Sequence, residues 1–345
     1  MIKKFCLILA SFFLLLSLAS GNRALAKADS SLPTGSTSAL IAGTSALIGS
    51  ASSFSFVYSA PNKQFVTDLV KQIAEILPTQ TLSSINVTEL SSLKPEITLV
   101  TTGRSALAEV LASPYYRQHR IVCTLISSAD YYAEINKYSS TELQTTALFS
   151  DPSPTHQIFL ASLLMDKPQI AFIYDTQTQF LIDIIRHAAK ANALPEPTFI
   201  ENNAANINVI LQNRQLADAD ILLASPLKTI YNSENTKNII FTLLSRNQAL
   251  IGYSSGWVSS GALATVYSDK DDITHSLADL LDSIAKSLTV TSSQALTMPA
   301  LPAPQYPNHI NVKLNQNIAK LLAIEPIAES ALADSLRERI AKNAH

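Results

Sequence analysis

The sequence predicts an α/β protein made of two lobes, each a doubly wound parallel sheet, with an interlobe cleft. Short apolar runs, typical of strands buried on both faces, alternate with segments of helical periodicity. The alternation fills two stretches of about 100 residues each, which favours two lobes over one large sheet. Apolar runs also end in small polar residues, as at Ser225-Pro226 after Ile221–Ala224 and Ser254-Ser255 after Ala249–Gly252. Such loops lie at the carboxyl ends of parallel strands, where ligands bind.

The first series of elements starts near Phe54, after a stretch rich in Ser, Thr, Ala and Gly at 27–52 that indicates a flexible lead-in. A helix is expected from about Phe65 to Leu77, because its apolar residues repeat at helical spacing. A second helix should follow Gly103 and end near Leu111. The expected strands are Phe54–Val57, Ile97–Thr101 and Arg120–Ile126.

The second series starts at Asp151-Pro152-Ser153-Pro154, with a helix to about Met165 and Ser153 or Thr155 as its N-cap. The expected strands are Gln169–Tyr174, Thr198–Ile200, Ile221–Ala224, Ala249–Gly252, Ala262–Tyr267 and Ile310–Val312. The expected helices are 180–189, 207–216, one segment between 225 and 248, 273–288 and 315–322. Prolines between 299 and 307 mark an extended connection, and residues 328–345 predict a charged helix or a frayed tail.

The first 26 residues have the pattern of a secretory signal peptide. Lys3 and Lys4 precede the apolar run Phe5–Leu18, and Ala24-Leu25-Ala26 matches an A-x-A cleavage site. Cleavage after Ala26 is expected, leaving 319 residues in the periplasm or outside the cell. A retained membrane anchor is the alternative, although the run is shorter than the ~20 residues of a spanning helix.

Composition narrows the class of protein. The chain is 47% hydrophobic and 15% charged, and its formal net charge of −2 becomes −5 when Lys3, Lys4 and Arg23 leave with the leader. No basic run is present, so nucleic acid is not expected as a partner. The mature chain would keep a single cysteine, Cys123, which lies in an apolar run and is expected to be an inert core residue.

Candidate ligand-binding residues are those that follow the predicted strands, where backbone N–H groups and short hydroxyl side chains converge. Ordinary turn and capping chemistry is the alternative for each of them. Trp257, the only tryptophan, either contacts the ligand or packs in the core. Tyr231, Tyr131 and Tyr132 are weaker candidates, expected at the rim or surface. The predicted binding residues are Thr101, Thr102, Ser128, Asp130, Tyr174, Thr176, Ser225, Ser254, Ser255 and Trp257.

Residues 252–256 match G-x-S-x-G, the nucleophile elbow of α/β-hydrolases, with Ser254 at its centre. An elbow requires a helix directly after the serine, and Trp257–Gly261 shows no helical period. A serine hydrolase, with His275 or His309 as base, is therefore the third choice of function, and no catalytic residue is predicted. The six histidines show no metal-binding spacing, and no P-loop or G-x-G-x-x-G occurs, so no metal or cofactor is expected.

The order of these pieces resembles the ABC-transporter substrate-binding family of the tryptophan/tyrosine-binding type, whose members have the type I periplasmic binding protein fold. The resemblance spans roughly residues 54–325 and is carried by Ala219–Leu223 with Thr229–Asn232, Ile251–Leu263, Ile170–Asp175 and Asn311–Ile324. The chain departs from the family at Ser225–Lys228, where an acidic residue is usual, and at Asp271–His275, where a glycine is usual. An amino-acid ligand needs an anion for its ammonium group, so the ligand is left open.

The resemblance implies a binding protein that closes by a hinge on a small molecule. Lobe 1 is expected at 53–150 plus 266–290, lobe 2 at 151–265 plus 291–325, and a C-terminal helical tail at 326–345. The first choice of function is a monomeric solute-binding protein that serves an ABC permease. The second is a sensor or accessory module that partners a membrane receptor without transport.

Overall fold

The computed structural model describes residues 52–138, 143–203, 206–291 and 299–343. The predicted leader with its cleavage site, and the lead-in at 27–51, lie outside the described residues. Residues 48–345 form one compact unit.

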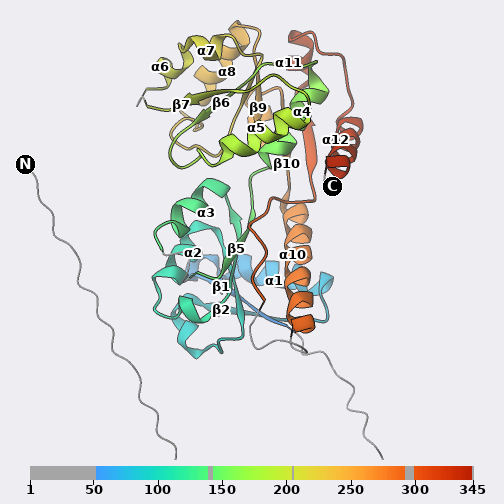
Figure 1. Cartoon of the computed structure of the whole chain (residues 1–345). Helices are drawn as coiled ribbons and strands as arrows, with labels where there is room; N and C mark the ends of the chain where they lie inside the picture. Colours follow the sequence, from blue (N-terminus) through green and yellow to red (C-terminus); the bar gives the residue numbers. More distant parts are fainter. Residues whose placement is uncertain (1–51, 139–142, 204–205, 292–298, 344–345) are drawn as a thin grey trace, which may run out of the picture. The chain divides into compact units, whose positions relative to one another are not determined.

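Two separate sheets form the centres of two α/β lobes, which confirms the predicted fold class (Figure 1). The lobe 1 sheet has the order β2-β1-β3-β4-β5 and is parallel throughout. The lobe 2 sheet has the order β11-β10-β9-β8-β6-β7, with β11 antiparallel to β10. The strands are β1 Ser53–Tyr58, β2 Thr81–Asn86, β3 Thr98–Thr102, β4 Ile121–Ile126, β5 Thr145–Phe149, β6 Ile170–Tyr174, β7 Thr198–Glu201, β8 Ile221–Leu223, β9 Ala249–Gly252, β10 Ala264–Tyr267 and β11 Asn311–Leu314.

Helices cover both faces of each sheet, so the strands are buried on both sides. In β4, Val122 faces the cluster under α1 and α10, whereas Cys123 faces the cluster under α2 and α3. Cys123 is fully buried, as predicted. The helices are α1 Lys63–Ile76, α2 Gly103–Ala112, α3 Ser128–Ile135, α4 Pro154–Leu164, α5 Leu181–Ala191, α6 Ile207–Leu211, α7 Arg214–Ala217, α8 Thr236–Ser245, α9 Ser255–Ser259, α10 Lys270–Thr291, α11 Gln316–Leu321 and α12 Glu329–Asn343, with short 3₁₀ turns η1 Ala60–Asn62, η2 Val87–Ser92 and η3 Tyr116–Gln118.

Several local predictions need correction. Ser128 and Asp130, expected after the strand Arg120–Ile126 and outside any predicted helix, lie in α3, which begins at Ser128 because the Ser127 side chain accepts a hydrogen bond from the Asp130 N–H as an N-cap. The turn after β9 likewise continues into the short helix α9. The expected helix at 207–216 is divided into α6 and α7, since Asn213 caps the second piece. Strands β2 and β5 were not predicted.

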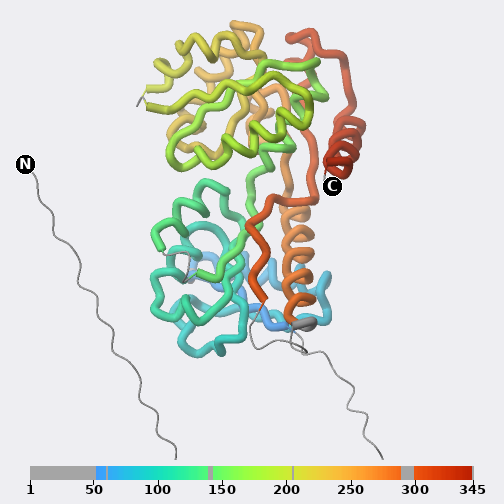
Figure 2. The backbone as a smooth tube through the Cα atoms, in the orientation of Figure 1, coloured from blue at the N-terminus to red at the C-terminus, as the bar shows by residue number. Residues whose placement is uncertain are grey.

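The chain passes between the lobes before α10 and again between the prolines at 299–307 and β11 (Figure 2). Helix α10 packs against α1 and β5 of lobe 1. The segment after it runs beside β5, where the Phe149 N–H donates to the Gln305 carbonyl at 2.9 Å and the Gln305 N–H to the Ala147 carbonyl at 2.8 Å. The chain then enters β11 of lobe 2. The residue boundaries predicted for the lobes stay a prediction.

The C-terminal segment is a docked helix. Helix α12 buries Leu332, Ala333 and Leu336 against α4 and β11 of lobe 2. The Glu329 carboxylate at its start accepts a hydrogen bond from the Leu314 N–H at 2.8 Å. The helix therefore belongs to the core packing of lobe 2.

Candidate functional site

Polar groups from both lobes meet beyond the carboxyl ends of β4, β8 and β9. We call this region the interlobe junction and define it as Ser127–Asp130, Asp151, Ser225–Lys228 and Tyr253–Trp257. Its first link is an ion pair between lobes, in which the Lys228 ammonium contacts both carboxylate oxygens of Asp130 at 3.0 and 2.7 Å. Lys228 lies in the loop after β8, and Asp130 lies in the first turn of α3. The loop that lacks an acid thus supplies a cation to the acid of the other lobe.

Asp130 has two further partners. The Ser127 hydroxyl donates to it at 2.9 Å, and Arg104 lies 3.3 Å away. Burial alone would raise the pKa of Asp130, but the hydrogen bonds from Lys228 and Ser127 and the charges of Lys228 and Arg104 outweigh burial and lower it. Asp130 is therefore a carboxylate at neutral pH, already neutralised by the protein itself.

Asp151 is the second acid of the junction and lies in the segment between β5 and α4. One carboxylate oxygen accepts the Ser128 N–H at 2.7 Å, and the other accepts the Ser128 hydroxyl at 2.6 Å. Burial raises the pKa of Asp151 to about 6, against the opposing hydrogen bonds from Ser128, and the nearby charge of Asp130 adds to the rise. Asp151 can therefore gain or lose a proton near neutral pH.

Two tyrosines from different parts of the chain face Asp151. Burial, followed by the charge of Asp151, raises the pKa of Tyr306, which also lies beside Ser128. Burial raises the pKa of Tyr253 as well, and the Asp151 charge adds to that shift. Asp151 therefore lies where the start of α3, the segment around Tyr306 and the end of β9 meet.

Gln157 of α4 fixes the ends of two lobe 2 strands. Its side-chain amide donates to the Ala224 carbonyl at 2.9 Å and to the Gly252 carbonyl at 3.0 Å. Next to Ala224, the Ser225 hydroxyl is buried and has no hydrogen-bond partner among the residues that the structure describes. A buried hydroxyl without a partner is costly, so a polar group of a ligand at this place would stabilise it.

Aromatic side chains pack behind these strand ends. Trp257 is 7% exposed and contacts Tyr231 edge-on, with ring centroids 5.7 Å apart, and Tyr253 at 5.8 Å. Trp257 thus packs in the core against two tyrosines, which was one of its two expected roles. Tyr231 is buried, and its hydroxyl donates to the Leu223 carbonyl, so its expected surface position is wrong.

The tyrosine pair of α3 also differs from expectation. Tyr131 is fully buried, and its hydroxyl lies 2.8 Å from that of Thr145, so it is not at the surface. Tyr132 is half-buried and contacts Phe180 of lobe 2 with ring centroids 4.6 Å apart. This aromatic contact is the second link between the lobes.

The predicted binding residues occupy three kinds of position. Ser128, Asp130, Ser225, Ser254, Ser255 and Trp257 belong to the junction. Thr101 and Thr102 are buried at the end of β3, and the Thr101 hydroxyl faces the Cys123 thiol rather than solvent. Tyr174 is half-buried at the end of β6, and Thr176 is exposed beyond it. Ligand contact by these residues stays a prediction.

The G-x-S-x-G segment has a strand, a turn and a helix, yet lacks the strained serine of an elbow. Ser254 has φ −157° and ψ 159°, an extended backbone that any residue adopts. The two candidate bases pack on each other, with ring centroids 5.6 Å apart, and bond to other groups: His275 to the Asp271 carbonyl and His309 to Asp279. Neither bonds to Ser254 within the described ranges.

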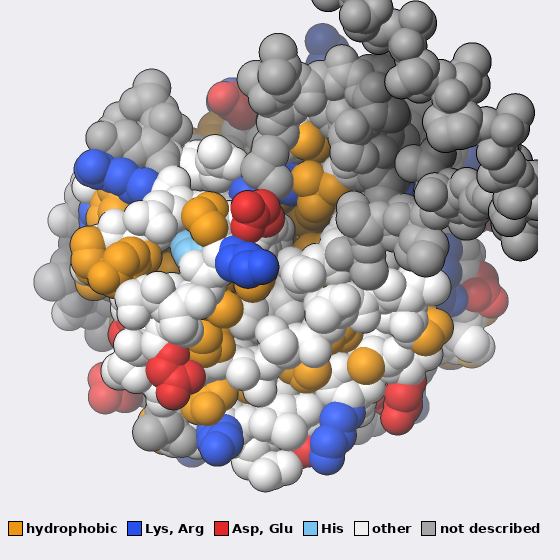
Figure 3. Space-filling model, turned by 90° about the horizontal axis from the view of Figure 1, so that it is seen from below, with side chains coloured by type: hydrophobic (Ala, Val, Ile, Leu, Met, Phe, Trp, Pro, Cys, Tyr) orange, Lys and Arg blue, Asp and Glu red, His pale blue; other side chains and the backbone are white. Residues whose placement is uncertain are grey.

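The described ranges contain no group of three His, Cys, Asp or Glu side chains suited to a metal ion. They also contain no helix with the length and apolar character needed to span a bilayer. On the face of lobe 1 in Figure 3, basic and acidic side chains are scattered among polar and apolar ones rather than gathered by sign.

Asp151 and Lys228 were not predicted as members of the junction, and Gln157 was not predicted to fix the strand ends beside it. Asp151 stands in a Pro- and Ser-rich helix start, which hides a carboxylate that bonds 23 positions back to Ser128. Lys228 meets an acid 98 positions away, and no local pattern signals that pairing.

No protein-family model and no curated protein matches the sequence. Among solved structures, the chain is similar to the ligand-free, open form of a substrate-binding protein with adhesive properties from Clostridium difficile, with TM-score 0.54 and 14% identity over 81% of this chain and 97% of that one. Two other structures are a conserved domain protein from Vibrio cholerae, with TM-score 0.47 and 15% identity, and an ABC domain in complex with L-Trp from Streptococcus pneumonia, with TM-score 0.46 and 13% identity. Each of these two alignments covers 82% of this chain and 98% of the other protein's chain. The similarity to the C. difficile protein, together with the two parallel-sheet lobes, shows the fold of the type I periplasmic binding proteins.

Proposed function

We propose that the chain is an extracytoplasmic solute-binding protein that holds a small molecule at the interlobe junction and delivers it to an ABC permease. The observation that carries the proposal is the convergence of strand ends from two parallel-sheet lobes on a set of polar groups. The signal-peptide pattern at 1–26 supports export, and a monomer is sufficient because each chain has both lobes.

The charges of the junction constrain the ligand. Asp130 is neutralised by Lys228 and Arg104, whereas Asp151 accepts hydrogen bonds from Ser128 and forms no ion pair within the described residues. A ligand amine would have to displace Lys228 from Asp130 or approach Asp151. A neutral polar ligand would instead pair with the Ser225 hydroxyl without disturbing either acid.

The proposal is tested by a thermal-shift screen of amino acids, nucleosides, sugars and small anions. A binder present at about 100 times its Kd adds about 2.7 kcal/mol to the free energy of unfolding. Ser225→Ala should weaken a neutral polar binder, and Lys228→Gln should strengthen a cationic one by removing one of the two cations that neutralise Asp130. Binding that neither substitution changes would place the solute elsewhere and contradict the proposal.

The second candidate is a sensor or accessory module that partners a membrane receptor. The ion pair between Lys228 and Asp130 favours this reading, because it joins the lobes without a ligand. Pull-down from membranes separates the two: recovery of an ABC permease supports transport, and recovery of a receptor or sensor protein supports the module.

A further inference from the structure

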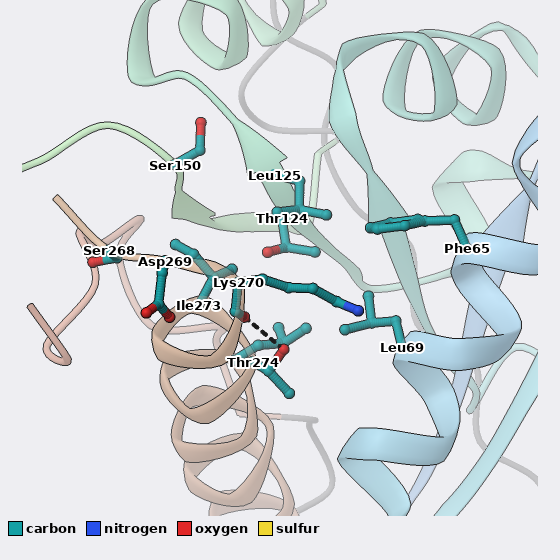
Figure 4. Close-up of a pocket in the computed structure, with 11 residues that line it drawn as sticks. Phe65, Leu69, Thr124, Leu125, Ser150, Ser268, Asp269, Lys270, Ile273 and Thr274 are labelled. Atoms are coloured by element: carbon teal, nitrogen blue, oxygen red, sulfur yellow. Dashed lines mark hydrogen bonds between the residues drawn. The ribbon is translucent and has the colours of Figure 1, made fainter. Parts of the chain in front are cut away.

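A hollow lies outside the interlobe junction, between the first turns of α1 and α10. We call it the α1–α10 pocket. It encloses about 360 Å³, and its floor is the end of β4. Its walls are mainly apolar side chains from three elements (Figure 4), namely Phe65, Leu69, Leu125, Ile273 and Leu277. A hollow of this size and character is suited to a small organic molecule.

The pocket is separate from the junction in its residues. Its lining comes from α1, β4, α10 and the connecting residues Ser150, Ser268 and Asp269, and includes no residue of the junction. The carboxyl end of β4 borders both places. A bulge between Thr124 and Ile126, where Leu125 has φ +55°, places Leu125 in the pocket wall, whereas Ser127 and Ser128 belong to the junction.

One buried polar group lines the pocket floor. The Thr124 side chain is fully buried, and its hydroxyl has no hydrogen-bond partner in the part of the chain that the structure describes. Figure 4 shows this hydroxyl at the floor of the pocket, on the side of α10. An unpaired buried hydroxyl costs about 1–3 kcal/mol, which a ligand hydroxyl or carbonyl group would recover.

The charges at the rim favour a neutral ligand. Asp269 and Lys270 both line the pocket and offset each other. The Asp269 carboxylate is already occupied, because it accepts the Asp272 N–H at 2.9 Å as a helix cap. The Lys270 side chain extends across the pocket toward Leu69 in Figure 4, so its aliphatic stem adds apolar contact. Phe65, 42% exposed, offers a ring face or edge at the mouth.

We propose that the α1–α10 pocket binds a neutral, largely apolar molecule with one hydroxyl or carbonyl group, independently of the solute at the interlobe junction. The polar group pairs with Thr124, and the apolar body packs against Phe65, Leu69 and Leu277. A carboxylate or ammonium group placed against Thr124 is disfavoured, because it would lose its hydration at an apolar floor while Lys270 and Asp269 stay exposed at the rim.

The test uses four probes with one framework: benzyl alcohol, toluene, benzoate and benzylammonium. Titrations followed by calorimetry and by amide NMR shifts of β4 and α10 should show benzyl alcohol binding about five- to tenfold more tightly than toluene, the factor for one neutral hydrogen bond. The two ions should bind more weakly still. Failure of benzyl alcohol to bind, or equal affinity for all four probes, would overturn the proposal.

Thr124→Val keeps the shape of the side chain and removes the hydroxyl. It should lower the affinity for benzyl alcohol to that for toluene and leave toluene unchanged. Thr67→Val, at a half-buried site on α1 whose hydroxyl bonds to the Lys63 carbonyl, is the matched control and should change neither. Equal losses for both probes in Thr124→Val would show that Thr124 only supports packing, and would contradict the assigned hydrogen bond. These outcomes are independent of the solute screen at the junction.

Discussion

Replacing Asp151 by asparagine should make the protein more stable at neutral pH and leave its stability in acid nearly unchanged. Burial raises the pKa of Asp151 from 3.8 to about 6, so the folded chain keeps this proton over a pH range in which the unfolded chain has lost it. Between those values the folded state binds more protons, and its free energy of unfolding therefore falls as pH rises. At 1.36 kcal/mol for each pKa unit, the loss amounts to about 3 kcal/mol and is complete somewhat above pH 6.

Urea denaturation of both proteins from about pH 3.5 to about pH 7.5 measures this effect, because the difference between them cancels the titration of other groups. Asparagine keeps an oxygen that can accept the Ser128 N–H. The stability of Asp151→Asn relative to the native chain should rise by about 3 kcal/mol across the range. Asp183→Asn, a change at a carboxylate that is 78% exposed, controls for the loss of one charge. A difference that stays constant with pH, or that falls, would contradict a raised pKa of Asp151 in the folded chain.

Three other substitutions or reactions test the packing. Gly252→Ala should lower the free energy of unfolding by about 1–3 kcal/mol, because a Cβ there would lie 2.4 Å from the Trp257 Cβ. Gly256→Ala, whose Cβ would meet no atom closer than 3.8 Å, is the control and should be nearly neutral. Equal melting temperatures of the two variants would contradict this. Arg120→Met should raise the free energy of unfolding by about 1–4 kcal/mol, since Arg120 is 3% exposed and its guanidinium nitrogens have no hydrogen-bond partner in the described chain. A lower free energy of unfolding in urea titrations would contradict this. Burial raises the pKa of Cys123 to about 12. This thiol should therefore react with a disulfide reagent at least about a thousandfold more slowly in the native than in the unfolded chain, which peptide mapping measures. Fast labelling of the native chain would contradict the burial of Cys123.

The strands with continuous apolar runs could be predicted from the sequence because burial on both faces leaves a local pattern. Strand β9 was predicted with its observed bounds, Ala249–Gly252, and β8 within one residue. Strand β2 is an edge strand with mostly exposed side chains, so it has no such run. Helix α3 did leave a signal, a serine followed three residues later by an acid at Ser127 and Asp130, which favours a helix start over a loop.

The candidate site was predictable in its location rather than its contacts. The rule that polar residues after parallel strands converge led to Ser128, Asp130 and Ser225, which all belong to the junction. The partners of these residues depend on tertiary structure: Asp130 meets Lys228 of the other lobe, and Ser128 meets Asp151. Separations of 98 and 23 residues leave no periodic pattern in a single sequence.

The central claim, that a solute binds at the interlobe junction, is tested most directly by a crystal structure with the compound that gives the largest shift in the thermal screen. Density for that compound is expected in contact with residues of both lobes, among them Ser225 and Asp151 or Asp130. Density confined to one lobe, with Lys228 still bound to Asp130 and the Ser225 hydroxyl still unpaired, would contradict it.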